Sequence, residues 1–354
     1  MNNEKSKVKE DEDLRPKTAI SLPEDIRMSN PFRNTLLQLV LIAGAIISTT
    51  LHARDFRSSD VHPSDYPTVE AVKYMGKLLS EQTKGRLGVR VYPSGSLGTE
   101  KDNIEQLKIG GLDMMRINAG PLNSVVPETI VTVLPFMFRS TEHMRKVLDG
   151  PIGAEILAAM ESQGLVGLAF YDSGSRSFYT AKKPVKSLAD MKGLKIRVQQ
   201  SDLFVSMIEA LGANPTPMPY GEVYTALKTG IVDAAENNWP SYESSRHFEA
   251  AKYYNLSEHS LAPEVLVFSK KIWDTVSKED QALLRKAARD SVPYMRKLWD
   301  EREVKSRKIV EAAGSQIVTI PNRQEFIDAM KPVYAKFANT PKLQDLVKRI
   351  QETK

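Results

Sequence analysis

The segment from residue 187 to residue 239 constrains the fold most, because it alternates short apolar strands with capped helices. Residues 194–198 (LKIRV) alternate apolar and polar side chains, which predicts a strand with Arg197 on the face opposite its apolar neighbours. Two helices and another strand are then predicted at residues 202–211, 221–229 and 230–234, and the Pro-rich stretch between the two helices is predicted to be a turn. This alternation predicts an α/β protein in which helices cover a mixed or parallel sheet.

Polar side chains gather where the two strands of this segment are predicted to end. They are Gln199, Gln200, Glu236, Asn237, Asn238 and Trp239. Ligands of open α/β sheets collect at the carboxyl ends of strands, and one arginine among several amides suits an organic anion. A guanidinium holds a carboxylate with two parallel hydrogen bonds, which lysine cannot do. Arg197 is therefore the candidate anchor, and the alternative is a surface arginine paired with Asp or Glu.

Four stretches of the chain are distinctive: GLKIRVQQS at 193–201, LGANPTPMPYGEVYTALKTGIVDAAENN at 211–238, YPSGSLGTEKDNIEQLKIGGLDM at 92–114 and LPFMF at 134–138. Over nearly all of residues 55–345, the chain resembles the substrate-binding proteins of TRAP (tripartite ATP-independent periplasmic) transporters, the DctP-like family. The resemblance implies a two-lobed α/β fold of the periplasmic-binding-protein kind, type II-like. It also implies a receptor that delivers a small molecule to a pair of membrane permease subunits.

An apolar pattern in the last third of the chain predicts one unusually long helix. Ser277 with Asp280 three residues later is similar to a capping box, and apolar residues recur until Gly314. Roughly 35 residues at 1.5 Å each give a helix about 50 Å long, which exceeds one small domain. We therefore expect this helix to run along both lobes, with a kink at Pro293. A spanning helix is a feature of the family that the chain resembles.

The predicted domain organisation follows from a turn-rich crossing at residues 172–176 and from an apolar strand near residues 263–269 that returns to the first lobe. The predicted divisions are 1–53 for an N-terminal extension and signal peptide, 54–173 for lobe I, 174–262 for lobe II, 263–302 for a return to lobe I that includes the first part of the spanning helix, and 303–354 for the rest of lobe II and the C-terminal helices. We expect a monomer.

The N-terminus predicts export. Residues 1–27 are rich in charge, whereas Met28 opens a segment with a basic start, an apolar stretch at 36–47 and a small residue at Ala53. This is the pattern of a secretory signal peptide, because about 12 apolar residues are too few to span a bilayer comfortably. We expect translation to start at Met28, cleavage after Ala53 and a periplasmic protein; the alternative is an uncleaved membrane anchor.

Charge and composition exclude several classes of protein. The 49 basic and 44 acidic residues leave a net charge of +5, but no Lys/Arg-rich block with stacking aromatics is present, so nucleic-acid binding is not expected. The sequence has no cysteine, no G-x-S-x-G, no P-loop, no H-E-x-x-H and no G-x-G-x-x-G. We expect no metal, no cofactor and no enzymatic activity. The alternative of another class is an exported enzyme with Glu100 or Glu236 as general base.

The resemblance assigns roles to residues of the candidate site. Arg197 corresponds to the family's carboxylate-anchoring arginine, and Asn237, after Glu236, matches the amide that orients the bound group. Arg176, in SGSRSFY, matches a second arginine that commonly contacts ligand, and its alternative is a salt bridge at the hinge. Two aromatic candidates complete the pocket, each with core packing as its alternative: Tyr220 and Trp239.

Other residues indicate which acid is bound. Gln200 and Asn118 stand where sialic-acid relatives often carry Asn and Glu, so sialic acid is disfavoured. Arg116, in a predicted strand of apolar residues, must face water, a carboxylate or a ligand. The motifs MMRIN, HPSDYPTV and WPSYE are most similar to those of receptors for hexuronates such as glucuronate and galacturonate.

A hexuronate needs one carboxylate clamp and several partners for its hydroxyl groups. The predicted hydroxyl partners are His62, Glu100, Arg116, Asn118, Gln200 and Glu236. A second possibility is a receptor for another organic acid such as a C4-dicarboxylate, which would need a second cationic anchor such as Arg116. The alternative of another class is then an exported uronate-processing enzyme.

Overall fold

The structure is a computed structural model, and it describes residues 53–354. The predicted start at Met28 and the apolar stretch at 36–47 lie outside these residues. Within the described part, no helix has the length and apolar character that crossing a membrane requires.

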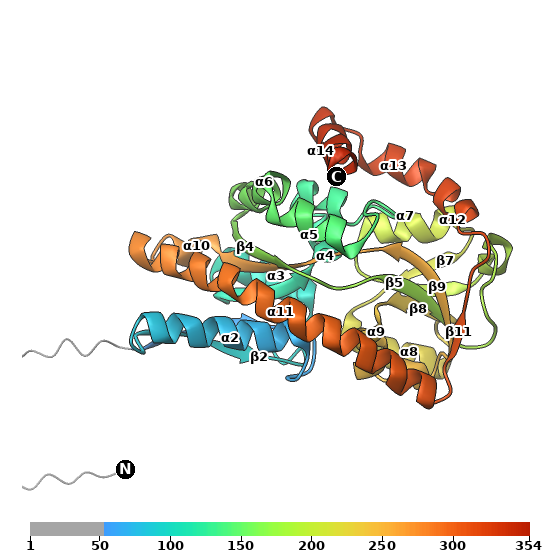
Figure 1. The fold of residues 1–354 in the computed structure, drawn as a ribbon, viewed down its shortest axis with the longest axis horizontal. Coiled ribbons are helices and arrows are strands. Elements are labelled where there is room, and N and C mark those ends of the chain that lie inside the picture. The colour runs from blue at the N-terminus through green and yellow to red at the C-terminus, as the bar shows by residue number, and fades with distance from the viewer. Residues whose placement is uncertain (1–52) are drawn as a thin grey trace, which may run out of the picture. The chain divides into compact units, whose positions relative to one another are not determined.

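Two sheets organise the described chain (Figure 1). The five-stranded sheet has the order β2-β1-β3-β10-β4, and its strands are β1 (Arg54–Ser59), β2 (Leu87–Tyr92), β3 (Met114–Asn118), β4 (Leu165–Tyr171) and β10 (Glu264–Ser269). The six-stranded sheet has the order β11-β9-β5-β8-β6-β7, and its strands are β5 (Arg176–Thr180), β6 (Lys195–Val198), β7 (Asn214–Pro217), β8 (Ala234–Asn237), β9 (Tyr253–Ser260) and β11 (Gln316–Val318). Both sheets mix parallel and antiparallel pairs, which confirms the predicted α/β class.

Helices cover both sheets, and the chain returns to the first sheet as predicted, because β10 lies between β3 and β4. The helices are α2 (Pro67–Gln82), α3 (Glu100–Ile109), α4 (Ala119–Leu122), α5 (Thr141–Asp149), α6 (Pro151–Ala159), α7 (Asp202–Ala210), α8 (Val223–Thr229), α9 (Trp239–Ser244), α10 (Lys270–Trp273), α11 (Lys278–Ala312), α12 (Gln324–Ala329), α13 (Lys331–Phe337) and α14 (Pro341–Glu352).

Helix α11 is the predicted long helix. It has 35 residues, and the Ser277 side chain accepts a hydrogen bond from the backbone N–H of Asp280 at its start. The helix packs on α2 and β4 beside the five-stranded sheet and on α9 beside the six-stranded sheet. Figure 1 shows it as the orange helix that passes along both sheets. Its buried face contains Leu284, Met295 and Trp299 in the apolar cluster beside α2, and Val310 in the cluster beside the six-stranded sheet, so burial of this stripe joins the two halves.

The C-terminal helices return across the molecule. Leu343, Leu346 and Ile350 of α14 are buried in the same apolar cluster as residues around α5 and α6. The imidazole Nε2 of His143, on α5, lies 2.9 Å from the carbonyl oxygen of Ile350. The last helix thus packs beside the part of the chain that we assigned to lobe I, and the lobe divisions at 173, 262 and 302 stay predictions.

Two strand predictions were wrong in ways that matter for the site. The strand expected at 230–234 begins only at Ala234, because Gly230 caps α8 with φ 75° and the N–H of Val232 still bonds back to the Ala226 carbonyl oxygen. Glu236 and Asn237 therefore lie within β8 and not beyond it. The Pro-rich stretch that we read as a turn contains β7, which pairs with β6 in parallel.

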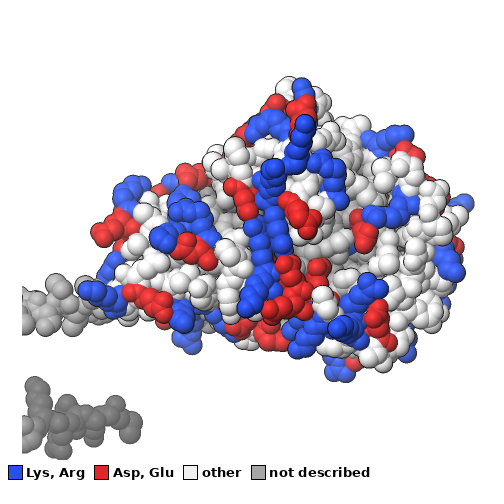
Figure 2. Space-filling model, in the orientation of Figure 1, with Lys and Arg blue, Asp and Glu red and all other residues white. Residues whose placement is uncertain are grey.

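Charged side chains on the face shown in Figure 2 are mixed, with acidic groups beside the basic ones. Many basic residues of the described chain are paired with acidic ones, for example the exposed pairs Lys286–Asp290 and Arg307–Glu311 along α11. Paired charges of this kind are typical of a solvated protein surface.

Candidate ligand-binding site

A cavity of about 260 Å³ opens between residues that follow strands of the two sheets. This volume is close to the lower end of the range for small-molecule sites, which begins at about 300 Å³. An inner chamber of about 20 Å³ adjoins it. The residues that line both chambers are Val61, Glu100, Arg197, Gln199 and Tyr220.

Arg197 contributes a buried cation to both chambers. Its neighbours Ile196 and Val198 point into the core of the six-stranded sheet, so the alternation of β6 places the guanidinium on the cavity side. Nε and Nη2 donate to the carbonyl oxygen of Met218 at 3.1 and 2.7 Å. Within residues 53–354 it forms no ion pair with a carboxylate, and burial is the main cause that lowers its pKa. The arrangement leaves Nη1 available to an anion.

Arg176 is also buried, but its charge is already neutralised. The antiparallel register of β5 and β8 pairs Ser177 with Asn237. Arg176 and Glu236, each next to one member of this pair, are therefore diagonal neighbours on the same face of the sheet. Arg176 Nε lies 2.5 Å from Glu236 Oε2, and Nη2 lies 2.8 Å from Oε1. Burial raises the pKa of Glu236, yet the Arg176 guanidinium and His259 together outweigh it and hold that pKa at about 2. The salt bridge that we gave as the alternative for Arg176 is therefore present.

Asn237 connects this salt bridge to the inner chamber. Its Oδ1 accepts from Arg176 Nη1 at 2.9 Å and from the backbone N–H of Asn238 at 2.9 Å. These two bonds fix the amide so that Nδ2 is the remaining donor, and it bonds no other described residue. Glu236 lines neither chamber, so the structure does not bring its carboxylate to the ligand space.

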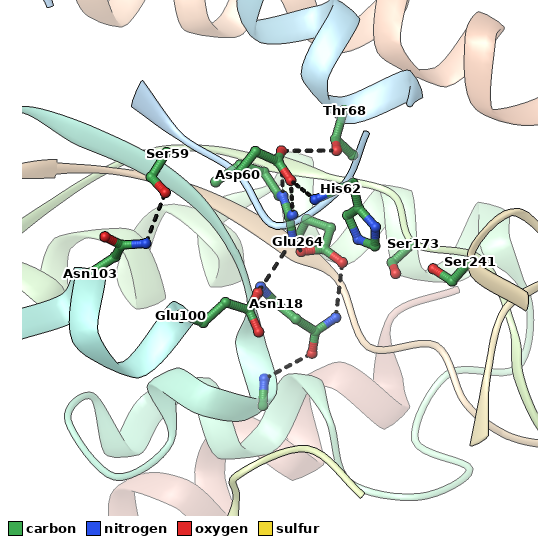
Figure 3. A network of polar contacts seen from close by, with 12 residues as sticks. Ser59, Asp60, His62, Thr68, Glu100, Asn103, Asn118, Ser173, Ser241 and Glu264 are labelled. Carbon is green, nitrogen blue, oxygen red and sulfur yellow. Dashed lines mark hydrogen bonds and ion pairs between the residues drawn. The ribbon is translucent and has the colours of Figure 1, made fainter. Parts of the chain in front are cut away.

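A second buried arginine, Arg116, lies at the centre of an acidic cluster. Its Nε donates to Asp60 Oδ2 at 2.9 Å, its Nη2 bonds Asp60 Oδ1, and its Nη1 donates to Glu264 Oε2 at 2.7 Å. Figure 3 shows Asp60, Glu100, Asn118 and Glu264 around this point. Asn118 Nδ2 donates to Glu264 Oε1 at 3.1 Å, as their pairing across β3 and β10 requires. Of the three possibilities for Arg116, the structure shows carboxylate pairing.

Glu100 is the member of this cluster that faces the open cavity. It is the first residue of α3, where the side chain of Thr99 caps the helix and forms a capping box with Asp102. Its Oε1 lies 3.5 Å from Arg116 Nη1 and accepts from the Asn118 N–H at 3.3 Å. Burial raises the pKa of Glu100 to about 7 against the opposing effect of Arg116, and Glu264 and Asp60 raise it further.

Other predicted residues also reach the cavity. His62 lines the inner chamber and stacks on Tyr66 at 3.9 Å, and burial lowers its pKa well below the usual range, so the imidazole is neutral. Its Nδ1 is buried without a partner among the described residues. The Tyr220 ring packs edge-on against His62, with ring centroids 4.8 Å apart. Gln200 lines the outer chamber.

Trp239 does not reach either chamber. Its ring stacks on Tyr254 with centroids 3.7 Å apart, and the Arg307 guanidinium lies over it. Trp239 begins α9, which turns the side chain toward the core around Tyr242. The prediction that Trp239 completes the pocket has no support in this geometry, whereas the alternative of core packing does.

The sequence analysis did not name Asp60 or Glu264 as residues of the site, and it named Gln199 at a strand end without giving it a role. Asp60 and Glu264 pair with Arg116 from positions 56 and 148 residues away, so no local motif marks them. Gln199 lines both chambers, and its Oε1 is buried without a partner among residues 53–354. Its position directly after β6 and next to Gln200, which was given a ligand role, was a usable signal.

Two mixed sheets joined by a long helix, with a polar cavity between them, define a two-lobed solute-binding protein. Residues 58–340 match the family described as bacterial extracellular solute-binding protein, family 7 (DctP), and the chain belongs to this family. Its members are solute-binding receptors, and relatives from Escherichia coli and Rhodobacter capsulatus are named as periplasmic binding proteins.

Solved structures of relatives carry sugar acids. A TRAP periplasmic solute-binding protein from Bradyrhizobium sp. BTAi1, in complex with α/β-D-galacturonate, is 77% identical with a TM-score of 0.84, covering 85% of this chain and 100% of that chain. One from Pseudomonas putida F1 with bound D-glucuronate is 42% identical, with a TM-score of 0.82 and coverage of 84% and 97%. A solute-binding protein of Chromohalobacter salexigens is 41% identical over 315 residues, 89% of this chain and 94% of the relative.

Proposed function

We propose that this protein is the periplasmic receptor of a TRAP transporter and that it captures a hexuronate of the galacturonate or glucuronate type. The observation that carries the proposal is Arg197, a buried guanidinium that lines the cavity and has no carboxylate partner among residues 53–354. Burying a charge without a counterion is unfavourable, so such a site favours an anion that supplies one. The sugar acids bound by the relatives from Bradyrhizobium and P. putida have one carboxylate.

The proposed binding mode places the carboxylate on Arg197. The Nδ2 of Asn237 donates a further hydrogen bond, and Arg176 holds the Asn237 amide in place through its bond to Oδ1. The hydroxyl groups meet the remaining polar residues of the cavity, which are His62, Glu100, Arg116 and Asn118 on the side of the five-stranded sheet and Gln199, Gln200 and Tyr220 on the side of Arg197. Glu236 acts indirectly, because its carboxylate is engaged by Arg176.

The transport cycle that we propose has three further parts. The chain is exported with a signal peptide cleaved after Ala53, and it acts as a monomer. The two lobes close on the sugar acid and exclude water, which strengthens each polar contact. The closed form presents a surface to the membrane permease subunits. An ion gradient across the membrane, used by the permease, supplies the energy for transport.

Isothermal titration calorimetry tests the ligand. The exported protein, freed of bound solute by dialysis, is expected to bind D-galacturonate or D-glucuronate at least about 100-fold more tightly than succinate. Binding of succinate without binding of either uronate would contradict the hexuronate and favour the C4-dicarboxylate alternative. A turnover assay on the uronate tests the enzyme alternative, in which Glu100, with a pKa of about 7, is the available base; formation of product would contradict the receptor function.

A further inference from the structure

The two sides of the cavity carry opposite charge. On the side of the six-stranded sheet, Arg197 has no carboxylate partner within the described chain, and Arg176 is balanced by Glu236. On the side of the five-stranded sheet, one cation, Arg116, is surrounded by three carboxylates, of Asp60, Glu100 and Glu264. Around the inner chamber, the first side therefore has one positive charge in excess and the second side has an excess of negative charge. The exposed Glu222 lines only the outer chamber.

This asymmetry distinguishes hydroxyl groups from carboxylates. A carboxylate in the protein accepts hydrogen bonds, and a sugar hydroxyl can donate one to it. A second carboxylate on the ligand only accepts, and it adds a like charge in a partly buried place, which disfavours binding. The acidic side therefore suits the polyol end of a ligand and not a second acid group.

We propose that Asp60, Glu100 and Glu264 make this site selective against a second carboxylate, so that a uronic acid binds and the corresponding aldaric acid is excluded. The proposal rests on the proposed function, because it takes the uronate carboxylate to lie on Arg197. It adds a specificity determinant on the opposite side of the cavity.

Glu100 is the residue through which this selection acts. Asp60 and Glu264 are both bonded to Arg116 and are nearly inaccessible, whereas the Glu100 side chain is 15% exposed and lines both chambers. Of the three carboxylates, Glu100 is thus the one most open to a ligand, whereas Glu264 lines only the inner chamber. The charged and titratable groups around it in the cavity are Arg116 on β3, Asp60 after β1, Glu264 on β10, Arg197 on β6, Arg176 on β5, His62, Asp102, Tyr220 and Glu222.

The test compares galacturonate with galactarate, the aldaric acid that oxidation at C1 would give. Calorimetry with the exported protein is expected to give galactarate an affinity at least about 100-fold weaker than that of galacturonate at pH 8. Galactarate is an open chain, so it differs from galacturonate in shape as well as in charge. This difference in shape is the same for every variant, and we therefore compare the ratio of the two affinities between wild type and variants. In Glu100→Gln, which keeps the shape of the side chain, this ratio is expected to shift toward galactarate by about tenfold or more.

A matched control removes the same charge elsewhere. Glu81→Gln, on the exposed face of α2, is expected to leave the ratio unchanged. Equal affinities of the wild-type protein for the two acids, or the same ratio in wild type and Glu100→Gln, would overturn the selectivity proposal. Lack of binding of both galacturonate and glucuronate to the wild-type protein would overturn the proposed function instead, so the two failures are distinct.

A second measurement needs no variant. Because the pKa of Glu100 is raised to about 7, ionisation between pH 6 and pH 8 increases the negative charge of this side. The affinity for galactarate relative to galacturonate is therefore expected to fall about tenfold over this interval in the wild-type protein. A ratio that stays constant from pH 6 to pH 8 would overturn the role of Glu100.

Discussion

Arg197 and Arg116 are both buried arginines beside one cavity, but their surroundings differ. Arg116 has three carboxylates around it, and Arg197 has one backbone carbonyl oxygen as its hydrogen-bond partner among residues 53–354. The carboxylates around Arg116 neutralise its positive charge within the protein. The positive charge of Arg197 stays available to a negatively charged ligand. A buried cation is thus a candidate for binding when its own chain does not neutralise it.

The largest expected effect is on stability, from Arg116→Met. This change leaves Asp60 and Glu264 buried without a cation, and breaking a buried pair in this way costs about 3 to 5 kcal/mol of unfolding free energy. Arg197→Met is the matched comparison, with an expected change within about 1 kcal/mol because it leaves no carboxylate unpaired. Urea unfolding of the two variants measures both values, and equal losses would contradict the distinction.

The next effect is on binding, from Arg197→Lys. The charge stays, but the planar pair of donors is lost, so uronate binding is expected to weaken by about 2 to 3 kcal/mol, or roughly 30- to 150-fold. Calorimetry measures the dissociation constant. Arg307→Lys, at an exposed position of α11, is the control and should bind as the wild type does. An unchanged constant in Arg197→Lys would remove this residue from the site.

A pH effect on the unliganded protein is expected to be somewhat smaller. The pKa of Glu100 is raised by burial to about 7 in the folded state, so its effect on stability is fully favourable below its ordinary pKa of 4.5 and is lost as the pH rises through 7. Glu100→Gln should therefore be more stable than the wild type at pH 8 by about 1 to 3 kcal/mol, with little of this gain at pH 4.5. Urea unfolding of both proteins at pH 4.5 and pH 8 measures this difference in stability. The same difference between Glu100→Gln and wild type at both pH values would contradict the prediction.

The smallest expected effect is that of Trp239→Phe. Because the Trp239 ring packs on Tyr254 and does not line the cavity, uronate affinity should stay within about twofold, with a loss of about 1 kcal/mol of stability from weaker stacking. A large loss of affinity without a loss of stability would show that Trp239 contacts the sugar after all.

The sequence predicted those features that depend on local patterns. The alternation of residues 194–198 placed Arg197 on the face opposite the core, and the cap at Ser277 with the apolar repeat predicted α11. The resemblance to a known family supplied the two-lobed fold. The sequence could not give the partners of Arg116, because Asp60 and Glu264 reach it only through the register of β1, β3 and β10.

Two other errors have physical causes. The proline residues in β7 argue against a strand, but β7 is an edge strand, where a missing N–H is tolerated. Trp239 follows the polar end of β8 directly, yet Asn238 caps α9 at this point and the helix turns the indole ring away from the cavity.

The structure of the complex with galacturonate tests the central claim most directly. We predict that the uronate carboxylate lies within hydrogen-bond distance, about 3 Å, of the Arg197 guanidinium, with the hydroxyl groups toward Glu100. A carboxylate bound elsewhere, with Arg197 still bonded only to the Met218 carbonyl oxygen, would contradict the account.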